Sequence, residues 1–142
     1  MNPMGDDAVL VDSAVALYAM GDAGERRDRS QAFLNALAEG RGRAYASVEM
    51  IQEAVHHRLR RTGDRTAAVA DVRDLIPTFV LLSFDREVLD LSLELIERTG
   101  IRGRDAVHAA TALAYGIDVI ASPDPAFDVV PGLRRVDPLT AA

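Results

Sequence analysis

Four acidic residues stand at positions from which carboxylates of a folded chain can act together. Asp12 and Asp124 follow predicted strands, and Asp105 begins a predicted helix. The fourth, Glu53, lies on the charged face of the helix that follows the second predicted strand. If they converge, two unit charges about 4 Å apart repel by about 4 kcal/mol at an effective dielectric near 20. Such a cluster takes up protons or binds cations. Oxygen ligands alone select hard ions, Mg²⁺ or Mn²⁺, which can activate water and stabilise a phosphorane-like transition state.

Each carboxylate also has an ordinary structural explanation when it is taken alone. Asp105 suits a helix start, where a carboxylate interacts well with the helix dipole. Asp124 lies in Ser-Pro-Asp-Pro, a typical turn sequence. Glu53 can be a solvated helix residue. Asp12 is harder to explain, because aspartate is depleted in strands and this one ends an apolar run.

Composition excludes several other kinds of site. The 142 residues suit a single domain, 1–142, and include no cysteine and no lysine. Disulfides, zinc–thiolate sites, thiol nucleophiles, P-loops and Schiff-base lysines are therefore excluded. The net charge of −6 argues against a protein that coats nucleic acid through bulk attraction. With no signal peptide or membrane-spanning run evident, we expect a cytoplasmic protein with no membrane contact.

Strands and helices are predicted to alternate along the chain. Short apolar runs predict strands at 8–11, 44–47, 79–84 and 118–121, and an edge strand at 133–136. Periodic runs predict helices at 14–20, 25–39, 48–61, 66–76, 86–99 and 105–115, with Pro77 ending the fourth. This alternation indicates a parallel sheet with helices on its faces. In such sheets, sites form at the carboxyl ends of the strands.

Two helices have faces that the sequence pattern predicts. In helix 48–61, one apolar stripe is expected to face the core, and it consists of Val48, Ile51, Val55 and Leu59. A charged stripe lies about 120° away, and it consists of Glu49, Glu53, His56 and Arg60. In helix 86–99, three apolar residues are in register: Leu89, Leu93 and Ile96.

The remaining candidate residues are histidines and arginines. His56, His57 and His108 lack the paired i, i+4 spacing of a metal site, so we expect surface or supporting roles. A run of arginines is most simply a solvated face, with contact to phosphates as the alternative, and it consists of Arg58, Arg60, Arg61 and Arg65.

The order of the acidic segments resembles that of PIN domains. The matching segments are 9–18 with Asp12, 48–61 with Gln52-Glu53, 103–116 with Asp105, and 120–128 with Asp124, followed by 132–138. The third segment, Gly-Arg-Asp-Ala-Val-His-Ala-Ala-Thr-Ala-Leu-Ala-Tyr-Gly, is the most specific. The length also resembles that of single-domain VapC-type toxins of type II toxin–antitoxin modules.

This resemblance carries expectations about fold, activity and partners. It implies a three-layer α/β/α fold with a central, mainly parallel sheet. It implies an endoribonuclease that depends on Mg²⁺ or Mn²⁺, forms a homodimer and is neutralised by a small VapB-like antitoxin. The four family acids map onto Asp12, Glu53, Asp105 and Asp124.

The sequence departs from the family pattern beside the first acid. Ala14 stands where a serine, threonine or asparagine is common, and we expect the adjacent Ser13 to point elsewhere on an extended chain. Ser122 stands where a small hydroxyl is common near the fourth acid, and we expect it to support the site.

The favoured hypothesis is a ribonuclease toxin. Asp12, Asp105 and Asp124 are expected to hold the metal, and Glu53 to hold it through water or to orient the attacking water. The alternative is a degenerate, non-catalytic PIN-type interaction module. A phosphate-receiver protein is disfavoured, because Ser13-Ala14 offers no second acid beside Asp12 and the chain has no lysine. The sequence does not identify the RNA.

Overall fold

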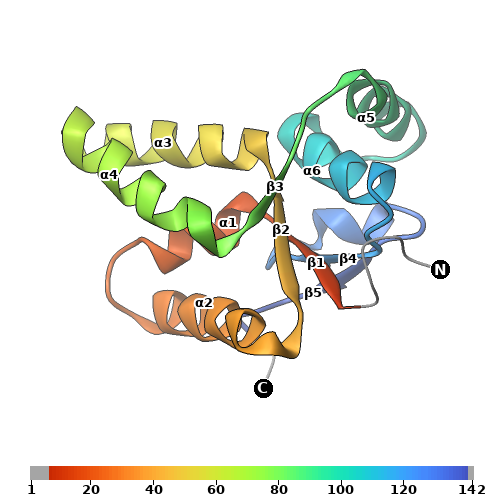
Figure 1. The fold of residues 1–142 in the computed structure, drawn as a ribbon. Coiled ribbons are helices and arrows are strands. Elements are labelled where there is room, and N and C mark those ends of the chain that lie inside the picture. The colour runs from red at the N-terminus through yellow and green to blue at the C-terminus, as the bar shows by residue number, and fades with distance from the viewer. Residues whose placement is uncertain (1–6, 141–142) are drawn as a thin grey trace.

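Five parallel strands form one sheet, which lies between two layers of helices (Figure 1). The computed structural model describes residues 7–140, so residues 1–6 and 141–142 of the expected single domain lie outside it. The strands are β1 (Ala8–Val11), β2 (Arg43–Ser47), β3 (Val80–Leu82), β4 (Val119–Ala121) and β5 (Arg134–Val136). Their order across the sheet is β3-β2-β1-β4-β5. The prediction of a three-layer fold with a parallel central sheet is confirmed.

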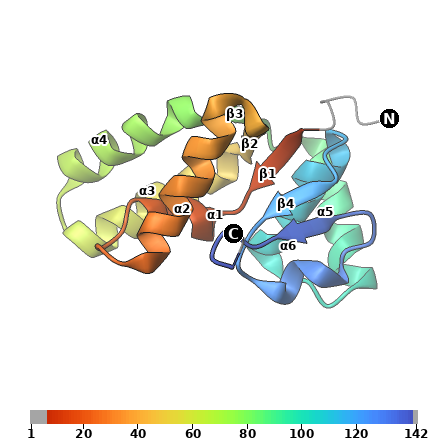
Figure 2. The same ribbon diagram turned by 90° about the horizontal axis from the view of Figure 1, so that it is seen from below.

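In the described part of the chain, six helices cover the sheet (Figures 1 and 2). They are α1 (Ser13–Ala19), α2 (Glu25–Ala36), α3 (Val48–Thr62), α4 (Arg65–Leu75), α5 (Arg86–Arg98) and α6 (Gly103–Ala114). Short helical turns at Leu37–Arg41, Ile76–Thr78 and Pro125–Val129 complete the order. Within residues 7–140, no helix combines the length and the apolar character needed to cross a membrane.

The sheet separates two hydrophobic cores. Successive side chains of a strand point to opposite faces, so Ala8 and Leu10 of β1 pack with α5 and α6, whereas Val11 packs with α1 to α4. Strand β4 divides in the same way between Ile120 and Ala121. The inner strands β1 and β4 are therefore largely buried on both faces, as their continuous apolar sequences predict, whereas Val80 of the edge strand β3 is 45% exposed.

The core face of α3 differs from the predicted stripe. Met50 and Ala54 are fully buried and form the centre of the packed face, whereas Val48 is 38% exposed. Ile51 and Val55 are partly buried and pack at the edge of this core. The predicted stripe lies about one residue away from the true centre, because Ala54 contributes little to a hydrophobic pattern.

Helix α5 also turns a different face to the core. Val88, Ser92 and Leu95 are buried, whereas the predicted stripe, Leu89, Leu93 and Ile96, is 40%, 56% and 43% exposed. The helix carries two apolar stripes, and periodicity does not show which one packs. The burial of Ser92 explains the error, since its hydroxyl donates to the Leu89 carbonyl at 2.7 Å and so carries no unpaired donor into the core.

Smaller differences occur at element ends. Helix α4 ends at Leu75, and Pro77 lies inside the following 3-10 turn rather than directly ending the helix. Strand β3 is shorter than the predicted strand 79–84. Helix α2 ends at Ala36, and the chain then turns through Gly40, whose φ of 96° favours glycine.

The packing of α5 predicts that two leucines two positions apart contribute very differently to the free energy of unfolding. Leu95→Ala removes a buried side chain and should lower the free energy of unfolding by about 2–5 kcal/mol. Leu93→Ala should change it by only about 0.5 kcal/mol, because Leu93 is largely exposed. Urea denaturation followed by circular dichroism measures both. A larger loss for Leu93→Ala would contradict this orientation of α5.

Candidate active site

The acidic residues lie at the place where the strand order reverses. The chain adds β2 and β3 on one side of β1, then crosses to add β4 and β5 on the other side. Open parallel sheets form their binding crevice at such a switch point, outside the carboxyl ends of the strands. Asp12 directly follows β1 and Ser122 directly follows β4, and these strands are neighbours. The topology therefore brings together segments that are 110 residues apart.

Asp12 is fixed by its neighbours at this switch point. Its side chain is buried, Oδ1 accepts from the Ser13 backbone N–H at 2.8 Å, and Oδ2 accepts from Ser122 Oγ at 2.8 Å. Burial raises the pKa of Asp12, although His108 and these hydrogen bonds oppose the rise. The register explains the contact with Ser122, because Val11 pairs with Ala121 in the sheet. The expected supporting role of Ser122 agrees with this hydrogen bond.

Glu53 reaches the same place from α3 and contacts a buried histidine of α6. His108 Nε2 lies 2.8 Å from Glu53 Oε1 and 4.0 Å from Asp12 Oδ1, and the His108 side chain is only 1% exposed. Burial opposes the charged forms, but the hydrogen bond and charges outweigh it, so the pKa of His108 is raised and the pKa of Glu53 is lowered. Ser13 and Arg104 also favour the ionised form of Glu53.

The close contact of His108 was not predicted. The sequence favoured a surface or supporting role for all three histidines, and only a supporting role agrees with the burial of His108. The available signal was its spacing, because His108 is three residues after Asp105 and so shares its helical face. His56, by contrast, is exposed on α3 and lies 3.0 Å from Gln52 Nε2.

Asp105 is the carboxylate whose pKa is raised by burial and then by the charges of the other three. It lies in the first turn of α6 and is partly buried. Burial, followed by the charges of Asp12, Asp124 and Glu53, raises the pKa of Asp105 to about 6, although His108 opposes the rise. The four side chains therefore share one electrostatic environment, and we refer to Asp12, Glu53, Asp105 and Asp124 as the acidic cluster.

Asp124 is exposed and stands on a short turn that its own side chain stabilises. Its Oδ1 accepts from the Ala126 backbone N–H at 2.9 Å, so the turn explanation considered for its sequence is also correct. Its backbone N–H donates to Ser122 Oγ at 3.0 Å. Ser122 thus connects the segment that carries Asp124 to the side chain of Asp12.

Arg135 of β5 holds the same segment from the other side. Its guanidinium donates to both carboxylate oxygens of Asp128, at 2.8 and 3.2 Å, and to the Ser122 carbonyl at 3.2 Å. The hydrogen bond from Arg135 lowers the pKa of Asp128. Asp128, which is four residues after Asp124, is therefore engaged in anchoring this loop.

The prediction that Ser13 points elsewhere is wrong. Ser13 begins helix α1 and does not continue an extended strand, so its Oγ lies 3.5 Å from Asp12 Oδ1. Its hydroxyl also helps to lower the pKa of Glu53. A hydroxyl is thus present beside the first acid even though Ala14 lacks one.

The donor chemistry of the acidic cluster fits Mg²⁺ or Mn²⁺. All four side chains offer oxygen, and the raised pKa of Asp105 reflects burial and then neighbouring negative charge, which a divalent cation would offset. Within residues 7–140, no three histidine or carboxylate side chains are arranged so that they alone could hold an ion. Mg²⁺ does not require such a cage, because it usually binds one or two carboxylates and keeps several waters.

Replacing Asp105 by asparagine should stabilise the metal-free protein at pH 8 and have little effect near pH 4. The folded protein retains the Asp105 proton up to about pH 6, whereas the ordinary pKa is 3.8. The free energy of unfolding therefore falls as pH rises between these values, and the cost persists above them. Asparagine carries no charge and avoids this cost.

Melting temperatures in EDTA, measured by circular dichroism at both pH values, test this prediction. Asp118→Asn, at an exposed position at the other end of β4, is the matched control and should show no such pH dependence. An Asp105→Asn difference that is equal at the two pH values would contradict the shared electrostatic environment.

Comparison with known proteins gives consistent matches. The PIN domain family matches residues 9–133. Ribonuclease VapC7 of Mycobacterium tuberculosis is 36% identical over 123 residues, which are 84% of this chain and 83% of that protein.

Solved structures match the fold over most of the chain. FitAcB from Neisseria gonorrhoeae has a TM-score of 0.74 at 20% identity, covering 94% of this chain and 99% of that one. VapBC2 from Rickettsia felis, bound to a DNA fragment from its promoter, has a TM-score of 0.72 at 16% identity, covering 92% and 98%. At these identities the structures establish similarity of fold.

Proposed function

This chain belongs to the PIN domain family and, within it, to the VapC ribonucleases, and we propose that it is a toxin that hydrolyses RNA at the acidic cluster. The observation that carries the proposal is the shared electrostatic environment of the four carboxylates at the switch point of the sheet. The pKa of Asp105, raised to about 6, is its clearest sign. A relative named as a ribonuclease supports the same activity.

Asp12, Asp105 and Asp124 are the residues that would hold Mg²⁺ or Mn²⁺. When bound, such an ion lowers the pKa of a bound water and stabilises negative charge on the phosphoryl group. Support comes from the oxygen-only donor set and from the unfavourable charge that Asp105 carries without a cation. Ser13 and Ser122 keep Asp12 in a fixed orientation.

Glu53 would orient the water that attacks the RNA phosphodiester. Its pKa is lowered, so it is ionised at neutral pH and accepts hydrogen bonds. His108 occupies Oε1 at 2.8 Å, which limits rotation of the carboxylate. The attack forms one bond from phosphorus to the water oxygen and breaks the bond to one ribose oxygen, which leaves with a proton.

The proposed partners are a small VapB-like antitoxin and a second copy of this chain. The solved structures of similar fold include toxin–antitoxin complexes, such as one from Klebsiella pneumoniae. An antitoxin arginine is well suited to the acidic cluster, because a guanidinium pairs with carboxylates through two hydrogen bonds and offsets their charge. Such a segment would block access of RNA to the acidic cluster.

The purified protein should cleave RNA with Mg²⁺ or Mn²⁺, and EDTA should abolish the cleavage. Asp12→Asn should also abolish it, because this change removes a central charge of the acidic cluster. Mn²⁺ should raise the melting temperature of the wild type more than that of Asp12→Asn, through binding to the native state. Full activity in EDTA would refute metal dependence. Folded, Mn²⁺-loaded protein that cleaves none of a broad RNA panel would favour the non-catalytic alternative.

The two glutamates of α3 should differ in their importance. Glu53→Gln should lower turnover by at least ~100-fold, the low end of what a positioned acid–base group contributes. Glu49→Gln, one helical turn earlier, should leave activity nearly intact and is the matched control. Single-turnover cleavage rates, with folding checked by circular dichroism, measure the ranking. The reverse ranking would show that Glu49 is the second acid.

A further inference from the structure

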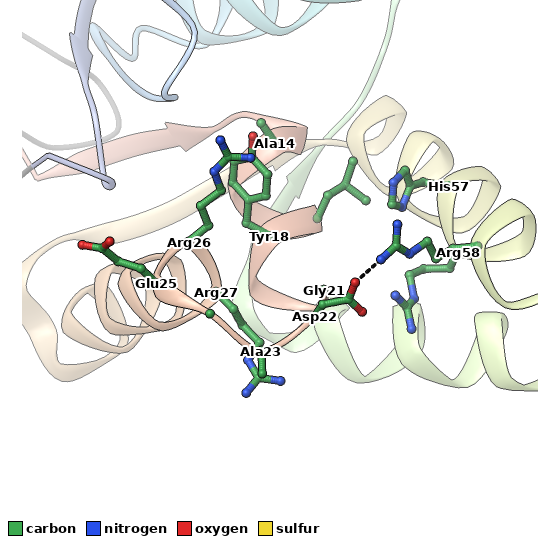
Figure 3. Close-up of a pocket in the computed structure, with 13 residues that line it drawn as sticks. Ala14, Tyr18, Gly21, Asp22, Ala23, Glu25, Arg26, Arg27, His57 and Arg58 are labelled. Atoms are coloured by element: carbon green, nitrogen blue, oxygen red, sulfur yellow. Dashed lines mark hydrogen bonds and ion pairs between the residues drawn. The ribbon is translucent and has the colours of Figure 1, made fainter.

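A hollow of about 650 Å³ lies between α1, the second half of α3 and the turn that leads into α2 (Figure 3). Its charged lining consists of Asp22, Glu25, Arg26, Arg27, Arg58 and Arg61. Four guanidinium groups face two carboxylates, so this lining is basic although the whole chain carries a net charge of −6. We refer to this hollow as the basic hollow.

The basic hollow begins close to the acidic cluster. Ala14, which lines it, is two residues after Asp12. On α3, His57 and Arg61 follow Glu53 by one and two turns, and both line the hollow. At a rise of 1.5 Å per residue they lie about 6 and 12 Å from Glu53 along the helix axis. Helix α3 therefore leads from the acidic cluster directly into the basic hollow.

The guanidinium groups of the hollow differ in their partners. Arg61 pairs with Asp22, and Arg58 donates two hydrogen bonds to Asp71, at 3.2 and 3.0 Å. Arg26 has no carboxylate partner among residues 7–140. Partial burial lowers the pKa of His57, and the positive charges of Arg61, Arg58 and Arg60 lower it further.

An aromatic ring provides the second chemical feature of the hollow. The guanidinium carbon of Arg26 lies 5.3 Å from the centroid of the Tyr18 ring, within the range of a cation–π contact. Figure 3 shows these two side chains together on one wall, with Arg58 across the hollow from them. An aromatic ring and an arginine placed together are the groups on which unpaired nucleic acid bases stack.

Electrostatics also require a basic surface near the acidic cluster. A polyanion approaching four carboxylates is repelled, and bound cations offset only the charge at the reacting phosphate. Phosphates on either side of that position need their own cations, and arginine suits them because it binds phosphate through two hydrogen bonds. An acidic protein segment would satisfy the arginines but would make no use of the Tyr18 ring.

We propose that the basic hollow binds unpaired RNA next to the scissile phosphodiester, with Arg26 and Arg61 contacting phosphates and Tyr18 stacking on a base. The inference rests on the proposed function for its substrate class. It adds a binding site outside the acidic cluster, formed by residues of α1, α2 and α3. Arg26 is the residue best placed to interact with both backbone and base.

Binding of a short fluorescein-labelled single-stranded RNA of mixed sequence, measured by fluorescence anisotropy in EDTA, tests the proposal without cleavage. Arg26→Ala together with Arg61→Gln should raise Kd by at least about tenfold. The same double variant should make binding depend less steeply on salt, by about 0.7 for each phosphate that the protein no longer neutralises. Tyr18→Leu should raise Kd by about tenfold, whereas Tyr18→Phe, which keeps the ring, should not. Arg86→Ala together with Arg98→Ala, on the exposed side of α5, removes the same number of charges and should bind as the wild type does.

The outcomes separate this proposal from the proposed function. Hollow variants that bind RNA as tightly as the Arg86→Ala, Arg98→Ala control would overturn the site, even if the wild type cleaves RNA. Loss of antitoxin binding with RNA binding unchanged would show that the hollow is a protein-binding surface. RNA binding that depends on the hollow, in a protein that never cleaves, would refute the proposed function and leave the site standing. A wild type that binds no RNA in EDTA would overturn the site, and cleavage with Mn²⁺ would then decide the proposed function separately.

Discussion

Repulsion among carboxylates at the carboxyl end of β1 is the constraint that organises the surrounding structure. Asp12 is buried among groups that favour its charge, but burial still raises its pKa. Glu53 is kept ionised mainly by His108, which is itself buried and depends on the carboxylates for its raised pKa. For Asp105, burial and then the neighbouring carboxylates raise the pKa to about 6, a cost of its charge that the protein alone does not remove.

The sequence was sufficient for the fold and for the positions of the four acids, and both follow from local pattern and topology. Continuous apolar strands that alternate with helices leave few arrangements other than a parallel sheet. Such a sheet brings strand ends together, so Asp12 and the segment carrying Asp124 could be expected at one edge. The role of each acid in catalysis is a separate matter, which position alone does not decide.

What the sequence could not predict depends on long-range packing. The buried face of α5 is chosen by what α6 and the sheet offer, and Val88 and Leu89 are equally apolar. The position of Ser13 depends on where the strand ends and α1 begins, which differs by one residue from the expected helix start. The contact between His108 and Glu53 joins residues 55 positions apart. The spacing of His108 from Asp105 places both on one face of α6 but does not identify the partner on α3.

The two edges of the sheet also bear on how this chain can associate with others. Strands β3 and β5 lie at the edges, and each has only three residues. An edge of this length exposes few unpaired backbone groups, so adding a strand from another chain would gain few hydrogen bonds. Extension of the sheet is therefore a weak route to assembly, and partners must recognise this protein through its helical surfaces and loops.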